Sequence, residues 1–282
     1  MLEVKKKDLL INSYSNISEL YNWLKKTQRR PTAKTRSEST DDINFYGTRS
    51  LEESYDMLIH SDEKLYKEID ETNRKIDITK IIGNKISRKK EKQDVVGYQP
   101  NVPLYLMGTP ENMINQEPKK ISQKILNICL NVSVNCGVSK QQIKNAGSIY
   151  AKTIDILEKM GYRCNLYILS VAQVYQETAY CLVKVKTDRE PFNLKKLCFL
   201  MANSGYDRRI VFKWLECCKI DKEITEYAYG RPITDKTLIT NTLRKYLKIE
   251  PIIWNIQSEN KTVEIDKILE DLENQGIKIK EV

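Results

Sequence analysis

Three small polar residues, Asn131, Ser133 and Asn135, alternate with valines directly after an apolar segment that begins at Ile125. Amide and hydroxyl oxygens at this spacing can ligate a cation or hydrogen-bond a polar ligand. A hard divalent cation prefers carboxylate oxygens, and this segment has none, although Asp207 could supply one from elsewhere in the chain. We therefore expect a degenerate ligand site with no bound metal or cofactor. The alternative is that these residues only end a strand and form a turn.

The chain lacks the sequence patterns of the common catalytic sites. It has no G-x-x-x-x-G-K-[ST], G-x-S-x-G or H-E-x-x-H motif, and its single histidine, His60, has no second histidine or cysteine nearby. A lone histidine provides neither a nucleophile–base pair nor a metal site. These absences favour a noncatalytic protein. A metal-dependent hydrolase built around Asp207 is the least favoured hypothesis for function.

Basic residues form three clusters in a chain whose formal net charge is +9. The clusters are Arg29 with Arg30; Arg88, Lys89, Lys90 and Lys92; and Arg208 with Arg209. A positive excess of this kind can attract nucleic acid or another polyanion, with an affinity that falls as salt rises. Solvated helix ends, and ion pairs with local carboxylates such as Asp207 or Glu216, are the alternative explanation.

An α/β sheet is expected to position the polar residues that follow Ile125. The apolar segment leads into a helix, which begins with a Ser139–Gln142 capping box and ends at Gly161, and then into a second strand over 164–169. This order is typical of a parallel sheet, whose ligands lie at the carboxyl ends of the strands. The predicted fold is a mixed, mostly parallel sheet covered by helices.

Alternating patterns add detail to this sheet. Residues 178–186 alternate apolar and polar side chains, which predicts a half-exposed strand at an antiparallel edge. The strand that ends near Asn131 also alternates, so one of its faces should be open or covered by a partner. Further strands are predicted over 252–256 and 277–279, with a helix over 263–274 between them.

The chain before the sheet is expected to be helical. The predicted regions are an N-terminal helical segment (1–28), a flexible basic linker (29–43), a helical region (44–96) and an α/β domain (97–282). A capping box at Asn16 and Glu19 begins the first helix. A later helical pattern runs from 62 to about 93, and the prolines and glycines of 97–110 are expected only to connect it to the sheet.

Four segments resemble, in their order, an uncharacterised family of tailed-phage and prophage proteins of unknown function. They are Phe45–Glu53, Asn101–Met113, Ala146–Tyr162, and Phe192–Leu194 followed by Asp207–Phe212. The resemblance implies a phage-encoded protein in the host cytoplasm, or associated with the virion, whose activity is unassigned. Seven cysteines without a C-x-x-C pair, and the lack of an apolar run of about 20 residues, agree with a reducing compartment and no membrane span.

The region from Asn131 to Leu169 is also distantly similar to von Willebrand factor A domains. Those domains carry a D-x-S-x-S motif after their first strand, which holds magnesium together with a threonine and an aspartate from two other loops. The matching positions here are Asn131, Ser133 and Asn135, so the first carboxylate of that motif is missing. The resemblance implies a von Willebrand factor A-like or Rossmann-like sheet used for binding proteins.

Three hypotheses for function follow from the sequence. The first is a noncatalytic phage-encoded protein that binds a phage or host protein through its α/β domain, in phage assembly or against a host target. The second is a basic nucleic-acid-binding phage protein, and the third is the metal-dependent hydrolase. The sequence leaves the oligomeric state open, and a homo-oligomer is compatible with all three.

Overall fold

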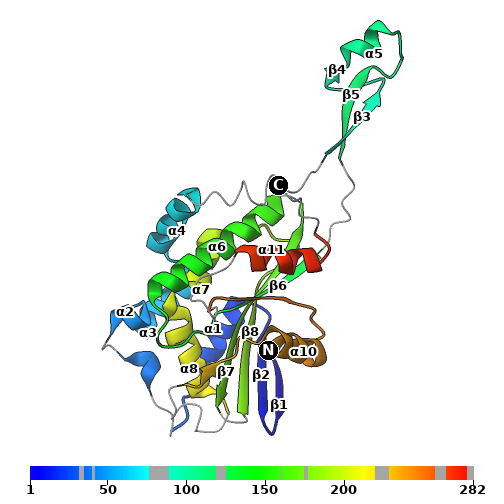
Figure 1. Ribbon diagram of the computed structural model, residues 1–282. Coiled ribbons are helices and arrows are strands. Elements are labelled where there is room, and N and C mark those ends of the chain that lie inside the picture. The colour runs from blue at the N-terminus through cyan, green and yellow to red at the C-terminus, as the bar shows by residue number, and fades with distance from the viewer. Residues whose placement is uncertain are drawn as a thin grey trace.

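The structure, a computed structural model, describes residues 1–31, 35–39, 42–75, 89–118, 125–159, 161–174, 177–219, 229–257 and 265–277. A main sheet contains β1 (Leu2–Lys6), β2 (Leu9–Tyr14), β6 (Ile125–Asn131), β7 (Arg163–Val174), β8 (Glu177–Lys186), β9 (Arg231–Pro232) and β10 (Ile252–Asn255). Around it lie η1 (Arg36–Glu38), α1 (Ile17–Lys26), α2 (Ile43–Tyr46), α3 (Leu51–His60), α4 (Glu63–Lys75), α6 (Lys140–Lys159), α7 (Leu194–Ala202), the π-helix η3 (Tyr206–Val211), α8 (Phe212–Cys217), α10 (Lys236–Leu247) and α11 (Ile265–Asn274) (Figure 1).

The main sheet has the strand order β1-β2-β8-β7-β6-β10, with β9 paired to β7. Strands β7, β6 and β10 are parallel to one another, and β2 is parallel to β8, whereas β7 and β8 form an antiparallel pair. The predicted mixed, mostly parallel sheet covered by helices is therefore confirmed. None of the helices in the described ranges has the length and apolarity that crossing a bilayer requires.

Helices cover both faces of this sheet. On one face α6 supplies Ile143, Ile154 and Leu157 to the larger core. On the other face Ile239 and Leu243 of α10 pack in a second core with Cys129 of β6. The alternating strand β6 therefore needs neither an open face nor a partner, because the chain's own helix α10 covers its second side.

The chain begins with strands, so the prediction of an α-helical N-terminal region is wrong. Strand β2 pairs along its whole length with β8, in register from Leu9 with Thr178 to Tyr14 with Val183, and β1 pairs with β2 at the edge. The predicted helix follows at α1, where Asn16 Oδ1 accepts the Glu19 backbone N–H at 2.9 Å. The lysines of β1 are tolerated because the strand is exposed at the edge of the sheet.

Strand β8 also differs from its prediction. It is antiparallel to β7 as expected, but β2 occupies its other side, so β8 is not an edge strand. Its side chains are buried on both faces, including Tyr180, Leu182 and Val183. The prediction was wrong because β2 was not recognised in the sequence. With β2 beside it, β8 is an internal strand whose two faces are both covered by helices.

The predicted helix after β6 is confirmed as α6. Ser139 Oγ donates to Gln142 Oε1 at 2.9 Å, and the chain leaves the helix through Gly161, whose φ of +93° suits a glycine. At Gly147 the helix lies against α7 so closely that an added Cβ would be 2.3 Å from the Met201 carbonyl oxygen. This close approach seats α7, which leads directly into the π-helix η3.

A separate small module interrupts the chain between α4 and β6. It contains β3 (Lys89–Asp94), β4 (Gln99–Pro100), α5 (Val102–Leu106) and β5 (Met113–Pro118), with the strand order β3-β5-β4. Figure 1 shows it standing apart from the α/β body. The structure thus has a strand at 89–94, where the sequence pattern predicted the end of a long helix. Residues 97–110, which were expected only to connect that helix to the sheet, belong to a folded unit. Residues 76–88 lie outside the described ranges.

Candidate functional site

A cavity of about 580 Å³ lies where the carboxyl end of β6 meets β7, at the position predicted for ligands. Its walls come from the loop after β6, the middle of β7, the helical segments η1, α2, η3 and α8, and the turn before β9. The lining residues that carry polar or aromatic groups are Arg36, Phe45, Ser133, Asn135, Cys136, Ser170, Asp207, Arg208, Phe212, Tyr229 and Arg231. We call this cavity the strand-end pocket.

A chain of three hydrogen-bonded side chains crosses the strand-end pocket. Ser133 Oγ lies 3.0 Å from Ser170 Oγ, and Ser170 Oγ donates to Asp207 Oδ1 at 3.3 Å. Ser133 Oγ also accepts the Val171 backbone N–H at 2.6 Å. When Asp207 is ionised, the single hydroxyl proton of Ser170 is used on the carboxylate, so the hydroxyl of Ser133 must donate to Ser170. The three groups therefore form one directional relay.

Burial raises the pKa of the Asp207 carboxyl to about 7. The neighbouring Arg208 guanidinium, the Ser170 hydroxyl and the Val134 backbone N–H act in the opposite direction, but they do not compensate for the lost hydration. The carboxyl group is thus divided between its neutral and charged forms near neutral pH. A group in this state can either donate or accept a hydrogen bond from a ligand.

The π-helix η3 positions Asp207, Arg208 and Arg209 in succession. A π-helical turn closes i→i+5 hydrogen bonds, is rare in proteins, and is frequently found at functional sites. All of its residues are buried, and α8 continues directly from it. The wider turn therefore brings three consecutive ionisable side chains into the interior of the α/β body.

The two buried arginines hold the surrounding loops in place. Arg208 donates to the carbonyl oxygens of Phe45, Asn135 and Val138, at 2.8, 3.2 and 2.6 Å, and its guanidinium stacks on the Phe45 ring at 4.1 Å. Arg209 has the corresponding role for the N-terminal segments. Its donors reach three carbonyl oxygens, those of Ser37, Ser39 and Thr48, and its guanidinium lies 4.5 Å from the Tyr46 ring centre.

The remaining basic candidates occupy separate places. Arg29 pairs with Glu38 at 2.7 Å and with the buried Glu216 at 2.8 Å, and the Arg30 backbone N–H donates to the Glu216 carbonyl oxygen. In the module, Lys89, Lys90 and Lys92 lie on β3, with Lys92 3.7 Å from Asp94. Arg88 lies outside the described residues. The structure thus divides the candidates for a nucleic-acid surface between the α/β body and the module.

Asn131 does not line the strand-end pocket. Its Nδ2 donates to the Ile233 carbonyl oxygen at 2.7 Å and to Asn255 Oδ1 at 2.9 Å, while its Oδ1 accepts the Ser133 backbone N–H at 3.3 Å. Asn135 lines the pocket, and its backbone N–H donates to Gln257 Oε1 at 2.6 Å. Of the four predicted ligand-loop residues, the structure therefore brings Ser133, Asn135 and Asp207 together.

The donor set fits a divalent cation poorly. Asp207 is the only carboxylate among the described lining residues, its pKa favours partial protonation, and both serine hydroxyls are already hydrogen-bonded. Within the described ranges, no three His, Cys, Asp or Glu side chains come together in a way that could hold a metal ion. Magnesium and calcium prefer several charged oxygens. The chemistry of this pocket instead suits a hydrogen-bonding organic ligand.

Sequence reasoning missed several pocket residues. Ser170 directly follows the predicted strand over 164–169, so its place at the carboxyl end of the neighbouring strand was a signal that could have found it. Arg36, Tyr229 and Arg231 gave no such signal. They lie in or beside η1 and β9, two short elements that no pattern predicted.

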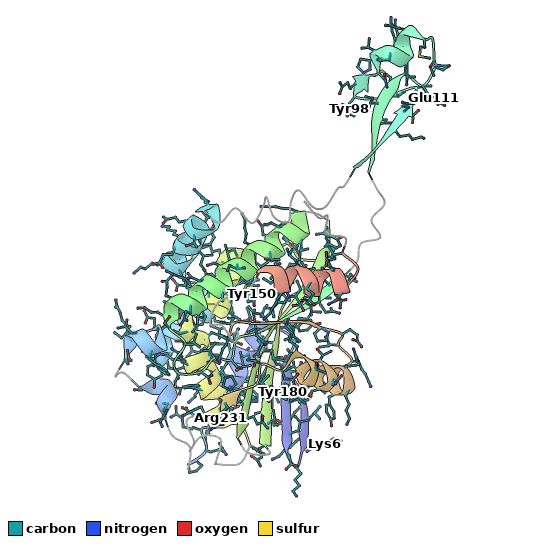
Figure 2. The ribbon with its side chains drawn as sticks, viewed as in Figure 1. Lys6, Tyr98, Glu111, Tyr150, Tyr180 and Arg231 are labelled. Carbon is teal, nitrogen blue, oxygen red and sulfur yellow. The ribbon has the colours of Figure 1, made fainter. Side chains whose placement is uncertain are left out.

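A second feature that sequence reasoning missed is an apolar surface on the module. Among the described residues, thirteen large hydrophobic side chains are exposed, and seven of them belong to the short stretch from 95 to 107. These seven, which we call the apolar tip, are Val95, Val96, Tyr98, Val102, Tyr105, Leu106 and Met107. Figure 2 shows Tyr98 and Glu111 on this module. The signal was present, because residues 95–110 contain no charged side chain.

Comparisons with known proteins give a family but no activity. Neither a curated protein nor a solved structure matches the chain. A family model described as a domain of unknown function, DUF7192, matches residues 3–277 and so includes both the α/β body and the module. The expected membership in an uncharacterised family is thereby confirmed, and the chain belongs to the DUF7192 family.

Proposed function

We propose that this protein is a noncatalytic, phage-encoded binding protein that recognises a protein partner through its apolar tip. The observation that carries the proposal is the concentration of seven of the thirteen exposed large hydrophobic side chains on one small module. Contiguous exposed apolar surface is uncommon on proteins that act alone, and it marks surfaces that become buried in a complex. The phage origin rests on the sequence resemblance described above.

Charge favours a protein partner over a phosphate-bearing surface. The charged residues that flank the uncharged stretch are Asp94 and Glu111, and both are acidic. Lys92 lies 3.7 Å from Asp94, and the module over 89–118 has three lysines against four carboxylates. The module therefore has no positive excess that would hold nucleic acid or an anionic membrane, and Glu111 repels both. An uncharged apolar groove on another protein would meet no such repulsion, so the tip fits that partner best.

The module presents the tip in a preorganised form. Asn101 caps α5 by accepting the Leu104 backbone N–H, and Pro103 lies in the first turn of the helix. Strand β5 pairs with both β3 and β4, which fixes the two ends of the segment that carries the tip. A surface held in its bound conformation loses less entropy on association. This supports a binding role for the module, with the α/β body as its scaffold.

The proposal shifts the binding surface from the α/β domain to the module. The two faces of the main sheet are covered by the chain's own helices, and Arg208 and Arg209 are used on backbone carbonyls. The other six exposed large hydrophobic side chains are spread between residues 1 and 238 and are not concentrated as those of the tip are. A phage assembly protein and a host protein are both partners of the required chemistry.

Site-specific photo-crosslinking in phage-infected cells tests this function. A photoreactive phenylalanine analogue replaces Tyr105, which is 65% exposed on the tip, and in a matched protein it replaces Leu238, which is 47% exposed on α10. We expect a defined protein adduct from position 105 that survives nuclease treatment and is absent from position 238. A nuclease-sensitive adduct, or equal adducts from both positions, would contradict the proposal.

A further inference from the structure

We propose that the strand-end pocket binds a small anion that carries a planar ring, of the size and charge of a nucleoside monophosphate. The inference concerns the α/β body and does not depend on the apolar tip. The strand-end pocket has a volume of about 580 Å³, which lies inside the range of about 300–1,000 Å³ that is typical of small-molecule sites.

Two arginines give the pocket its preference for an anion. Arg36 and Arg231 both line it and are exposed, and neither has a carboxylate within ion-pair distance among the described residues. Among the lining residues that the structure describes, Asp207 is the only acidic one. Guanidinium groups bind phosphate and carboxylate oxygens through paired hydrogen bonds. Two exposed guanidinium groups at the rim, of which that of Arg36 lies 5.9 Å from the Tyr229 ring centre, therefore suit the charged end of a ligand.

Aromatic and apolar side chains account for the planar part of the ligand. Phe212 and Tyr229 are stacked with their ring centres 4.3 Å apart and an interplanar angle of 22°, and Phe45 is half-buried in the wall. Aromatic walls of this kind bind planar rings through stacking and hydrophobic contact. In the same pocket the relay from Ser133 through Ser170 ends at the Asp207 carboxyl, which can hydrogen-bond the edge of such a ring.

The turn that carries Tyr229 and Arg231 is held in an unusual conformation. Tyr229 has a φ of +68° and Gly230 a φ of +85°, and a left-handed backbone at a residue other than glycine is sterically unfavourable. The Tyr229 hydroxyl donates to the buried Glu216 at 2.6 Å and accepts the Arg36 backbone N–H at 3.2 Å. The fold thus fixes both rim arginines around one tyrosine, as a preformed binding site requires.

Cys136 provides a direct test, because it lines the strand-end pocket and is the only exposed one of the seven cysteines. The rate at which a thiol reagent modifies Cys136 is measured with AMP, UMP, adenosine and inorganic phosphate as added probes. We expect AMP or UMP to slow modification saturably, by roughly tenfold when the probe is about ten times above its Kd. Adenosine, which lacks the anion, and phosphate, which lacks the ring, should protect much less.

A charge-matched pair of variants makes the test specific. Arg36→Ala with Arg231→Ala should weaken nucleotide protection by roughly tenfold or more, because both rim guanidinium groups are lost. Arg163→Ala with Arg189→Ala removes the same charge from exposed positions outside the pocket lining and should leave protection unchanged. The proposal is overturned if no nucleotide protects Cys136, if adenosine protects as well as AMP, or if both double variants lose protection equally.

Discussion

The strand-end pocket and the apolar tip differ in how their side chains are partnered. Around the pocket, the conspicuous arginines Arg208 and Arg209 are buried and donate to main-chain carbonyls. On the tip, Leu106 and Met107 have the residue types of a core, yet they are 78% and 76% exposed. Residue type alone therefore misleads in both regions. Exposure in the folded chain, and not residue type, decides which of these side chains a partner can reach.

The difference also predicts separate consequences of mutation. A buried charge that satisfies several backbone groups contributes to stability, since its loss leaves polar atoms buried without hydrogen bonds. An exposed apolar side chain contributes little to folding, so its loss should affect only binding.

The largest effect is expected for Arg209→Met. The substitution keeps an unbranched side chain but leaves the carbonyl oxygens of Ser37, Ser39 and Thr48 without their donor, and should lower the free energy of unfolding by about 5 kcal/mol. Urea denaturation measures this value, with the exposed Arg189→Met as the control. A loss as small as that of the control would show that the arginine is not a structural element.

The next effect is a change in the pH dependence of stability caused by Asp207→Asn. The pKa of Asp207 is about 7 in the folded chain, against 3.8 for an unperturbed aspartate, so between these values the native state retains a proton that the unfolded chain has lost. The wild type therefore loses stability as pH rises from about 4 to 7, by an amount on the order of 4 kcal/mol from this group. The variant lacks this contribution.

Denaturation curves at several pH values check the prediction for Asp207. The difference in unfolding free energy between the variant and the wild type should move in favour of the variant as pH rises from 4 to above 7. A difference that stays constant over this range would show that the Asp207 carboxyl titrates normally in the folded protein.

A smaller effect is expected for Ser170→Ala. This change removes the hydroxyl that joins Ser133 to Asp207, which should cost about 1 kcal/mol of stability. The Ser170 hydrogen bond lowers the pKa of Asp207, so its loss should raise that pKa further. Carbon-detected NMR titration of the Asp207 carboxyl gives the pKa directly. An unchanged or lowered pKa would contradict the proposed hydrogen bond from Ser170 to Asp207.

The smallest effect on stability is expected in the apolar tip. Leu106→Ser with Met107→Ser should change the free energy of unfolding by less than about 0.5 kcal/mol, because both side chains are already in water. In contrast, Leu243→Ser in α10, where the side chain is fully buried, should cost several times more. A tip variant as unstable as the core variant would show that the tip packs within the folded chain.

Sequence patterns predicted those elements whose signals are local. The capping boxes at Asn16 and Ser139 correctly mark α1 and α6, and the apolar segment after Ile125 correctly gives β6. Strand β2 was missed because its pairing with β8 involves residues more than 160 positions away, which no local pattern records, and β1 was missed with it because β1 pairs with β2. The module was missed because its glycines and prolines are equally typical of a loop.

The candidate site shows the same division. Ser133 and Asn135 could be predicted because they follow a recognisable strand, and Asp207 was chosen by its chemistry alone. Their assembly depends on a π-helical turn and on the packing of η1 and β9, which are set by tertiary contacts. Arg36 lies in the segment predicted to be a flexible linker. Tertiary contacts fix it beside the pocket, namely those of Ser37 with Glu216 and Arg209 and that of the Arg36 backbone with Tyr229.

The most direct test of the account measures crosslinking at position 105 and stability in the same pair of proteins. The tip variant Leu106→Ser with Met107→Ser should keep the wild-type free energy of unfolding and lose the nuclease-resistant protein adduct, while the matched surface variant Leu238→Ser keeps both. A tip variant that retains the adduct at the wild-type level, with its stability unchanged, would contradict the claim that the tip is the surface that binds a protein partner.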